Sequence, residues 1–363
     1  MSQKTISKIC RYATSHGYKY LSLEQKADSI VCRYDNNHYL RLPRITEEHI
    51  ISLFRSLLES EENDYVYNKN FKIMDGKQVI KGSATISPAK YGDKININLN
   101  TTLPTLKQFS RLGLNKVQKT QLTTALEKKN GLIIISAPEQ HGLTSTYYSL
   151  LDLLNHDRSV YSLEDFPEYS LNGVNTIRLQ EYGGLKMSLD LLRRLDTDII
   201  ACDCKLKPAD LKLLWQNADS RLIIAAMYSK SSADVLRSLK SAGISSAAIA
   251  QRLLVISHQR LFKQQCVQCL EVEAESEELK KQIVKKWPIT KKYWPQRSYV
   301  NRGCKKCQSS QNLDKVRIFE IMNFDKNGKL KTEYNPLILE ALRKVELGII
   351  NLEEIADWAQ SNK

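Results

Sequence analysis

Residues 131–144 carry the strongest structural signal in the chain and read Gly131-Leu132-Ile133-Ile134-Ile135-Ser136-Ala137-Pro138-Glu139-Gln140-His141-Gly142-Leu143-Thr144. The continuous aliphatic run predicts a fully buried strand, and the residues after it predict a loop and a helix that begins near Thr144. Similar apolar strands at 159–163, 199–202 and 222–227 alternate with helical segments. Residues 106–262 are therefore expected to form an α/β core around a parallel sheet.

Three further parts surround this core. Residues 1–105 are expected to form an N-terminal mixed α/β domain, with a hairpin over 29–42 and a helix capped by Thr46. Residues 263–322 contain two C-x-x-C pairs and are expected to form a cysteine subdomain. Residues 323–363 are expected to be a C-terminal helical region.

The composition is typical of a soluble globular protein. The chain has 363 residues, 42% of them hydrophobic and 26% charged, which fits two or three domains and excludes a disordered or fibrous chain. Its 54 basic and 40 acidic residues give a net charge of +14, which favours an acidic partner such as nucleic acid, anionic lipid or an acidic protein. No apolar run reaches the roughly 18 residues of a membrane span, and no secretory signal is recognisable. We therefore expect a cytoplasmic protein.

The loop after the first buried strand occupies the position of a P-loop but lacks its cation. In a P-loop, G-x-x-x-x-G-K-[ST], backbone N–H groups surround phosphate, the lysine neutralises it and the hydroxyl holds magnesium. Here Gly142 and Thr144 remain, whereas Ala137 replaces the first glycine and Leu143 the lysine. Loss of a charged donor costs roughly 1.5–3 kcal/mol for the contact alone. Slow or absent hydrolysis is expected, and a plain strand-to-helix turn is the alternative.

Further motifs resemble the secretion ATPases of type II secretion, type IV pilus assembly and competence systems, over about residues 27 to 325. Residues 163–168 resemble the acidic box V-E-D-P-x-E, with Glu164 and Asp165 retained. Residues 194–200 resemble the R-x-D-P-D-[IV]-[IV] approach to the Walker B strand. Gln259-Arg260-Leu261 matches the family's Q-R-L, and residues 315–320 are close to its R-x-G-I-[YF]-E.

Departures from the family fall on the residues of the reaction. The Gly-Glu that ends Walker B is Asp203-Cys204 here, and Tyr228 stands in place of the box histidine. Strand alternation directs Asp203 away from the face of the missing glutamate. The residual catalytic candidates are Glu164, Asp165 and Asp203. The P-loop lysine, the Walker B glutamate and the box histidine are all replaced, whereas the packing motifs are kept. This pattern favours a protein that keeps the family's fold and has lost its reaction.

The resemblance implies a RecA-like core, ring-forming subunits and a doubtful site for ATP and magnesium. The residues that correspond to a nucleotide site are Pro138, Gly142, Thr144 and Ser145, with Arg33 reaching toward a neighbour's nucleotide or remaining an ordinary surface residue. It also implies contact with an inner-membrane platform protein or a paralogous ATPase, in a homomeric or mixed ring. The expected location is the cytoplasm, with peripheral attachment at the inner membrane.

Four of the eight cysteines have the spacing of a metal site. Cys266-x-x-Cys269 and Cys304-x-x-Cys307 supply four thiolates, and each C-x-x-C turn presents two sulfurs about 3.5–4 Å apart, which suits tetrahedral zinc. All four positions are filled by protein, so a structural zinc is expected, as in the tetracysteine subdomain of many such ATPases. Free thiols or a redox pair are the alternatives.

The favoured function is a degenerate ATPase-family component that completes or regulates a pilus or secretion motor. One alternative is a slow ATPase that uses Glu164, Asp203 and a cation from a neighbour, such as Arg33 or Lys77. The other is a basic zinc module that binds nucleic acid, because the region also has the following lysines and aromatic residues: Lys280, Lys281, Lys285, Lys286, Lys291, Lys292, Trp287, Tyr293 and Trp294. Since no base-reading helix is recognisable, nucleic acid is the less favoured partner.

Overall fold

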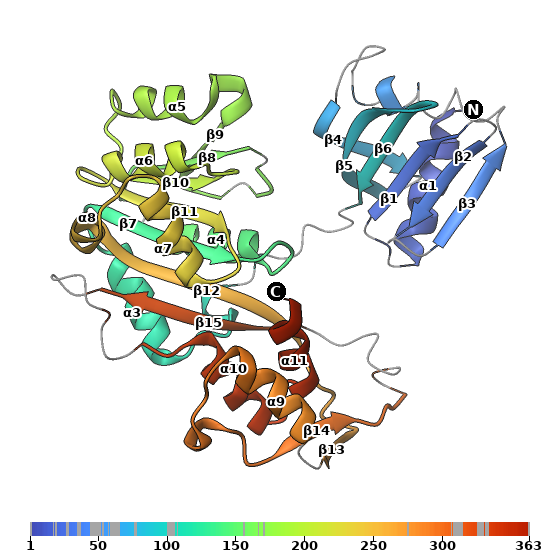
Figure 1. Cartoon of the computed structure of the whole chain (residues 1–363). Helices are drawn as coiled ribbons and strands as arrows, with labels where there is room; N and C mark the ends of the chain where they lie inside the picture. Colours follow the sequence, from blue (N-terminus) through green and yellow to red (C-terminus); the bar gives the residue numbers. More distant parts are fainter. Residues whose placement is uncertain are drawn as a thin grey trace. The chain divides into compact units, whose positions relative to one another are not determined.

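The structure is a computed structural model with two compact units, Met1–Thr105 and Leu106–Lys363 (Figure 1). It describes residues 2–16, 18, 20–26, 29–34, 38–43, 52, 54–56, 58, 66–75, 78–99, 106, 108–154, 157–165, 167–169, 171–273, 276–305, 307, 315–324, 330 and 334–361. The expected helix cap at Thr46 and the cation candidate Lys77 lie outside the described residues.

The N-terminal unit is an antiparallel sheet with a helix packed against it (Figure 1). The strand order is β3-β2-β1-β6-β5-β4. The strands are β1 (Tyr20–Gln25), β2 (Ser29–Tyr34), β3 (His38–Pro43), β4 (Val66–Asp75), β5 (Gln78–Ala89) and β6 (Gly92–Asn98). The expected hairpin is confirmed as β2 and β3, whose residues pair from Ser29 with Pro43 to Tyr34 with His38.

Helix α1 (Ser2–Ser15) was not predicted from the sequence, although its spacing is helical. The buried residues Ile6, Ile9, Cys10 and Ala13 recur every three or four positions and pack into the core of the N-terminal unit.

The second unit contains the expected parallel sheet. Its order is β15-β12-β7-β11-β10-β8-β9, and all neighbouring pairs are parallel except β12 with β15. The strands are β7 (Gly131–Ala137), β8 (Val160–Glu164), β9 (Val174–Arg178), β10 (Ile199–Asp203), β11 (Leu222–Tyr228), β12 (Leu253–Lys263) and β15 (Lys315–Asn323). The predicted α/β class is therefore confirmed.

Helices cover both faces of this sheet because the residues of β7 alternate between two apolar clusters. Ile133 and Ile135 pack with α3 and α4, whereas Leu132 and Ile134 pack with α5 to α8. The helices are α3 (Lys116–Leu126), α4 (Leu143–Leu151), α5 (Gly184–Leu192), α6 (Pro208–Asn217), α7 (Ser232–Ser241) and α8 (Ser246–Arg252). Short 3₁₀ turns at Phe109–Arg111 and Leu179–Tyr182 precede α3 and α5.

The cysteine segment and the last helices share one apolar cluster. Strands β13 (Leu270–Glu273) and β14 (Ser298–Asn301) form an antiparallel pair. Ile283 of α9 (Glu277–Lys286) packs in the same cluster as residues of α10 (Leu337–Glu346) and α11 (Leu352–Ser361). Phe262 and Ile318 connect this cluster to the large sheet. None of the described helices is long and apolar enough to cross a membrane.

Candidate functional site

The loop between β7 and α4 has two residues in the left-handed region and ends at a helix without a side-chain cap. Gly142 is the N-cap of α4 and has a φ of 76°, and Gln140 has a φ of 63°. No side chain caps the helix, so the N–H groups of its first turn are left for water or a ligand. Free N–H groups at a helix start are one of the features that phosphate-binding loops use.

Strand β12 fixes this loop through the residues that match the family's Q-R-L. Gln259 is buried; its Nε2 donates to the carbonyl oxygen of His141 at 2.8 Å, and its Oε1 accepts from Oγ1 of Thr146 at 2.6 Å. The backbone N–H of Leu261 donates to Nδ1 of His141 at 3.0 Å. The loop conformation is therefore maintained by protein contacts.

Leu143 occupies the lysine position and is part of the hydrophobic core. Its side chain is 3% exposed and belongs to the cluster that contains Ile135 and Tyr147. An aliphatic group buried in this way supplies packing energy and no charge toward the loop. Pro138, Thr144 and Ser145 lie at the same loop, each partly exposed.

Thr144 faces the tyrosine that replaces the box histidine. The Thr144 side chain lies close enough to the Tyr228 hydroxyl to lower the pKa of Tyr228. Burial raises the pKa of Tyr228, and the negative charges of Asp203, Glu168 and Glu139 add to this effect. The hydroxyl that would hold magnesium thus contacts a tyrosine in acidic surroundings.

Glu164 is locked into a buried hydrogen-bond network. Its side chain is 1% exposed, and its two carboxylate oxygens accept hydrogen bonds from the hydroxyls of Tyr148 and Ser162. Ser162 also bonds the Tyr147 hydroxyl at 2.6 Å. Burial raises the pKa of Glu164. This carboxylate joins β8 to α4, and both of its oxygens already accept a hydrogen bond within the protein.

Asp203 lies at the end of β10, on the α4 face of the sheet. Ile199 and Ala201, which alternate with it, pack in the α4 cluster, whereas Cys204 packs on the other face. The predicted alternation is thereby confirmed. Burial raises the pKa of Asp203 to about 7, with further contributions from neighbouring carboxylates. Asp165 is held nearby, since its Oδ2 accepts from the backbone N–H of Lys205 at 3.2 Å.

The sequence reasoning missed Arg317 on β15. A Cβ placed on Gly142 would lie 3.0 Å from Nε and Nη2 of Arg317, so this guanidinium covers the first residue of the loop-to-helix turn. The available signal was that Arg317 stands where the family motif R-x-G-I-[YF]-E has glycine. Arg33, by contrast, is an exposed residue of β2 in the N-terminal unit, and its role toward a nucleotide stays a prediction.

The four predicted cysteines come together beside the β13–β14 pair. Their sulfur atoms all lie within 4.8 Å of one another. The measured Sγ–Sγ distances are 3.8 Å for Cys266–Cys304, 3.7 Å for Cys269–Cys307 and 3.8 Å for Cys304–Cys307. Four thiolates bound tetrahedrally at a Zn–S distance of about 2.3 Å would be about 3.8 Å apart. The cluster therefore has the donors and the spacing to hold a metal ion.

The aromatic residues of the basic segment are partly engaged in packing. Trp287 contacts Trp358 with ring centroids 4.3 Å apart, and Nζ of Lys280 lies 5.4 Å from the Trp294 ring centre. Trp287 and Trp294 both pack against the cluster of α9 to α11, whereas Tyr293 is half exposed. A continuous stacking platform for bases is not formed by these three rings.

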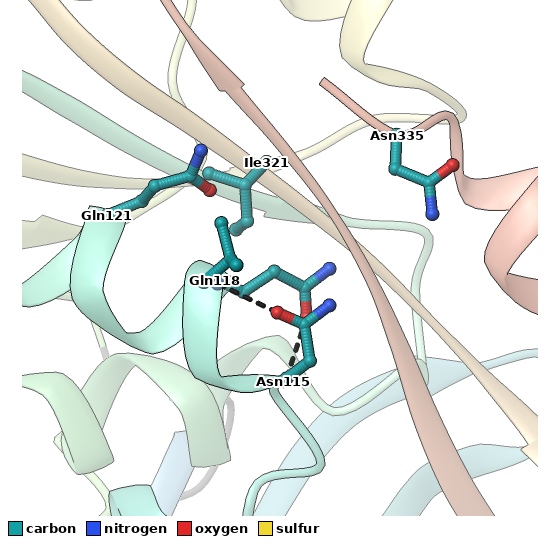
Figure 2. A pocket seen from close by; sticks show the side chains of 6 residues that line it. Asn115, Gln118, Gln121, Ile321 and Asn335 are labelled. Atoms are coloured by element: carbon teal, nitrogen blue, oxygen red, sulfur yellow. Dashed lines mark hydrogen bonds between the residues drawn. The ribbon is translucent and has the colours of Figure 1, made fainter. Parts of the chain in front are cut away.

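A pocket of about 310 Å³ lies between α3 and β15 (Figure 2). Asn115 and Gln118 form the capping box of α3 at its wall, and Nε2 of Gln118 donates to the Phe319 carbonyl at 2.9 Å. Its lining is Asn115, Val117, Gln118, Gln121, Ile321 and Asn335. Since all of these side chains are neutral, the pocket offers no general acid, base or nucleophile.

Comparisons with known proteins agree with this fold. The chain is 22% identical to the type IV pilus assembly ATPase PilB of Thermus thermophilus, over 98% of this chain and 42% of that protein. It is 24% identical to the protein transport protein HofB homolog of Escherichia coli, over 75% of this chain and 63% of that one. The chain spans about half the length of the curated relatives it matches.

Solved structures show the same architecture. The ATPase DotB of Legionella pneumophila superposes with a TM-score of 0.66 at 12% identity, covering 100% of this chain and 97% of that one. The pilus retraction motor PilT with bound ADP gives a TM-score of 0.66 at 16% identity, covering 97% and 96%. The family described as type II/IV secretion system protein matches residues 4–346. Since that match spans nearly the whole chain, the protein belongs to the type II/IV secretion system protein family.

Proposed function

We propose that this chain is a degenerate member of its family that acts as a structural or regulatory component of a type IV pilus, competence or type II secretion assembly system. The observation that carries the proposal is the burial of Leu143 in the core at the position of the P-loop lysine. The names of the relatives, which include type IV pilus assembly ATPases, support the choice of machine.

Two further features support loss of turnover. Cys204 replaces the Walker B glutamate, and Glu164 already uses both carboxylate oxygens in the protein. One electrostatic contact to a transition state is worth about 10²–10³-fold in rate. Losing the lysine and the glutamate together is expected to leave hydrolysis below detection.

The proposed partners are an inner-membrane platform protein or a paralogous ATPase, with the chain as a subunit of a homomeric or mixed ring in the cytoplasm, peripheral to the inner membrane. We further propose that Cys266, Cys269, Cys304 and Cys307 hold a structural zinc ion. Zinc would join the two C-x-x-C turns and stabilise the β13–β14 pair.

Phosphate release from ATP by the purified protein tests the main proposal. We expect no turnover with magnesium present, in the wild type and in Asp203→Asn alike. A slow ATPase is the second candidate, because a carboxylate with a pKa near 7 lies beside Tyr228 and Thr144. Turnover in the wild type that Asp203→Asn abolishes would establish this second candidate and refute the first.

A further inference from the structure

Arg317 is a buried cation that has no counter-charge among the described residues. The residue is 8% exposed, and among the described residues its Nε has no hydrogen-bond partner. None of the ion pairs found in the described part of the chain includes it. Burial lowers the pKa of its guanidinium, with no opposing contribution from an acidic group. Isolated buried charges are strongly unfavourable, so an arginine in this position calls for an anion.

The position of the guanidinium shows where that anion would bind. Nε and Nη2 lie against Gly142, whose φ of 76° and missing Cβ leave room for them. Gly142 is the N-cap of α4, a helix of nine residues with no side-chain cap. Helix N-termini favour anions through free N–H groups and the helix dipole, and a guanidinium presents several donors in a plane that fits phosphate oxygens. Two sets of hydrogen-bond donors thus lie at one turn.

Basic groups act near Gly142, and acidic groups act near Tyr228. Burial, together with the charges of Arg260 and Lys315, lowers the pKa of His141 to about 4, so His141 is neutral and two cations act on it. Near Tyr228 and Thr144 the charges come from Asp203, Glu168 and Glu139. An anion is therefore favoured beside Arg317 and disfavoured beside the Tyr228 hydroxyl.

We propose that Arg317, with the first N–H groups of α4, binds one phosphate group and thereby substitutes in binding for the lysine that the loop lacks. The ligand is an anion that contains a phosphate group, either a nucleotide or inorganic phosphate. The proposal goes beyond the degenerate-ATPase function, because binding and turnover are separate properties. The loop held by Gln259 would then respond to a ligand even in a subunit that does not hydrolyse ATP.

Calorimetric titration of the full chain with ADP, pyrophosphate and inorganic phosphate at constant ionic strength tests this site. We expect saturable binding of at least one ligand, weakened at least tenfold in Arg317→Gln. Arg178→Gln removes an exposed charge from β9 and should change affinity less than about threefold. Tighter binding of ADP than of pyrophosphate identifies a nucleotide site, and equal affinity identifies a phosphate site. Absence of saturable binding, or unchanged affinity in Arg317→Gln, overturns the proposal.

Two further variants separate binding from folding. Arg317→Met removes an unpaired buried charge, so the melting temperature without ligand should stay the same or rise, while the rise caused by ligand disappears. A lower melting temperature with the ligand-induced rise intact shows a structural role and overturns the proposal. Arg317→Lys keeps the charge but loses the planar set of guanidinium donors, so it should bind the ligand three- to tenfold more weakly. Unchanged affinity in this variant overturns the role proposed for the guanidinium. ATP turnover, measured on the same samples, would contradict the degenerate function and leave this binding result standing.

Discussion

The Tyr148 hydroxyl donates a hydrogen bond to Oε2 of Glu164 and accepts one from the backbone N–H of Glu168 at 2.8 Å. Tyr148 lies on the helix that follows the phosphate-type loop, and Glu164 ends the neighbouring strand β8. The acidic motif that in the family resemblance suggests catalysis is thus part of the connection between helix and sheet.

Tyr148→Phe should destabilise the protein because it leaves a buried carboxylate oxygen and a backbone N–H unpaired. The expected loss is about 1–3 kcal/mol, or a fall of several degrees in melting temperature. Tyr182→Phe is the matched control, since Tyr182 is 51% exposed. Thermal unfolding of both variants measures the difference. Equal melting temperatures would show that the network around Glu164 contributes nothing to stability.

Asp203 should make stability depend on pH in the range from about 4 to 7. Burial raises its folded-state pKa to about 7 from an ordinary value of 3.8. The unfolded chain therefore loses this proton at lower pH than the folded chain. The protein is therefore most stable, as far as Asp203 is concerned, below about pH 4. As the pH rises to 7, the free energy of unfolding falls by at most about 4 kcal/mol.

Asp203→Asn removes this titration and should be more stable than the wild type at pH 8. Urea unfolding at half-unit steps of pH gives the two curves, with Glu181→Gln as an exposed acidic control. The slope of the wild type between pH 4 and 7 should be reduced in Asp203→Asn and unchanged in Glu181→Gln. Parallel curves for all three proteins would refute the raised pKa.

Cys266→Ser should lose bound zinc and stability together. Wild-type protein purified under reducing conditions is expected to contain one zinc per chain, and the variant far less, because three thiolates hold zinc more weakly than four. Cys204→Ser is the control, since Cys204 lies outside the four-cysteine cluster. Elemental analysis and thermal unfolding with and without a chelator provide the readouts. A wild type without zinc, and insensitive to chelator, would show that the cluster is not a zinc site.

The parts of this molecule that depend on local pattern were predictable from the sequence. The aliphatic run of β7 and the C-x-x-C pairs act over a few residues, so they indicated the parallel sheet and the metal-type cluster directly. Arg317 beside Gly142 was not predictable, because the contact joins distant segments through the antiparallel pairing of β12 and β15. Glu164 stays a predicted catalytic candidate, but its motif did not reveal that Tyr148 and Ser162 donate hydrogen bonds to its oxygens.

Leu143→Lys tests whether the loop still has its original geometry. Because Leu143 is 3% exposed, the change places an ammonium group at a core position. We expect the free energy of unfolding to fall by about 2–4 kcal/mol in the absence of ligand. Leu143→Met keeps the volume and should cost less than about 1.5 kcal/mol. If the lysine can leave the core toward phosphate, ATP should bind more tightly and restore part of the lost stability.

Titration of ATP into both variants gives the answer, read together with phosphate release. Tighter binding by Leu143→Lys than by Leu143→Met shows that the turn held by Gln259 is a working phosphate loop that lacks its cation. Equal affinity would mean that Arg317 already occupies the space the lysine needs. In either case hydrolysis should remain absent, because Cys204 and Tyr228 still stand where the family has glutamate and histidine. Turnover gained by this single change would show that the other two replacements matter little for the reaction.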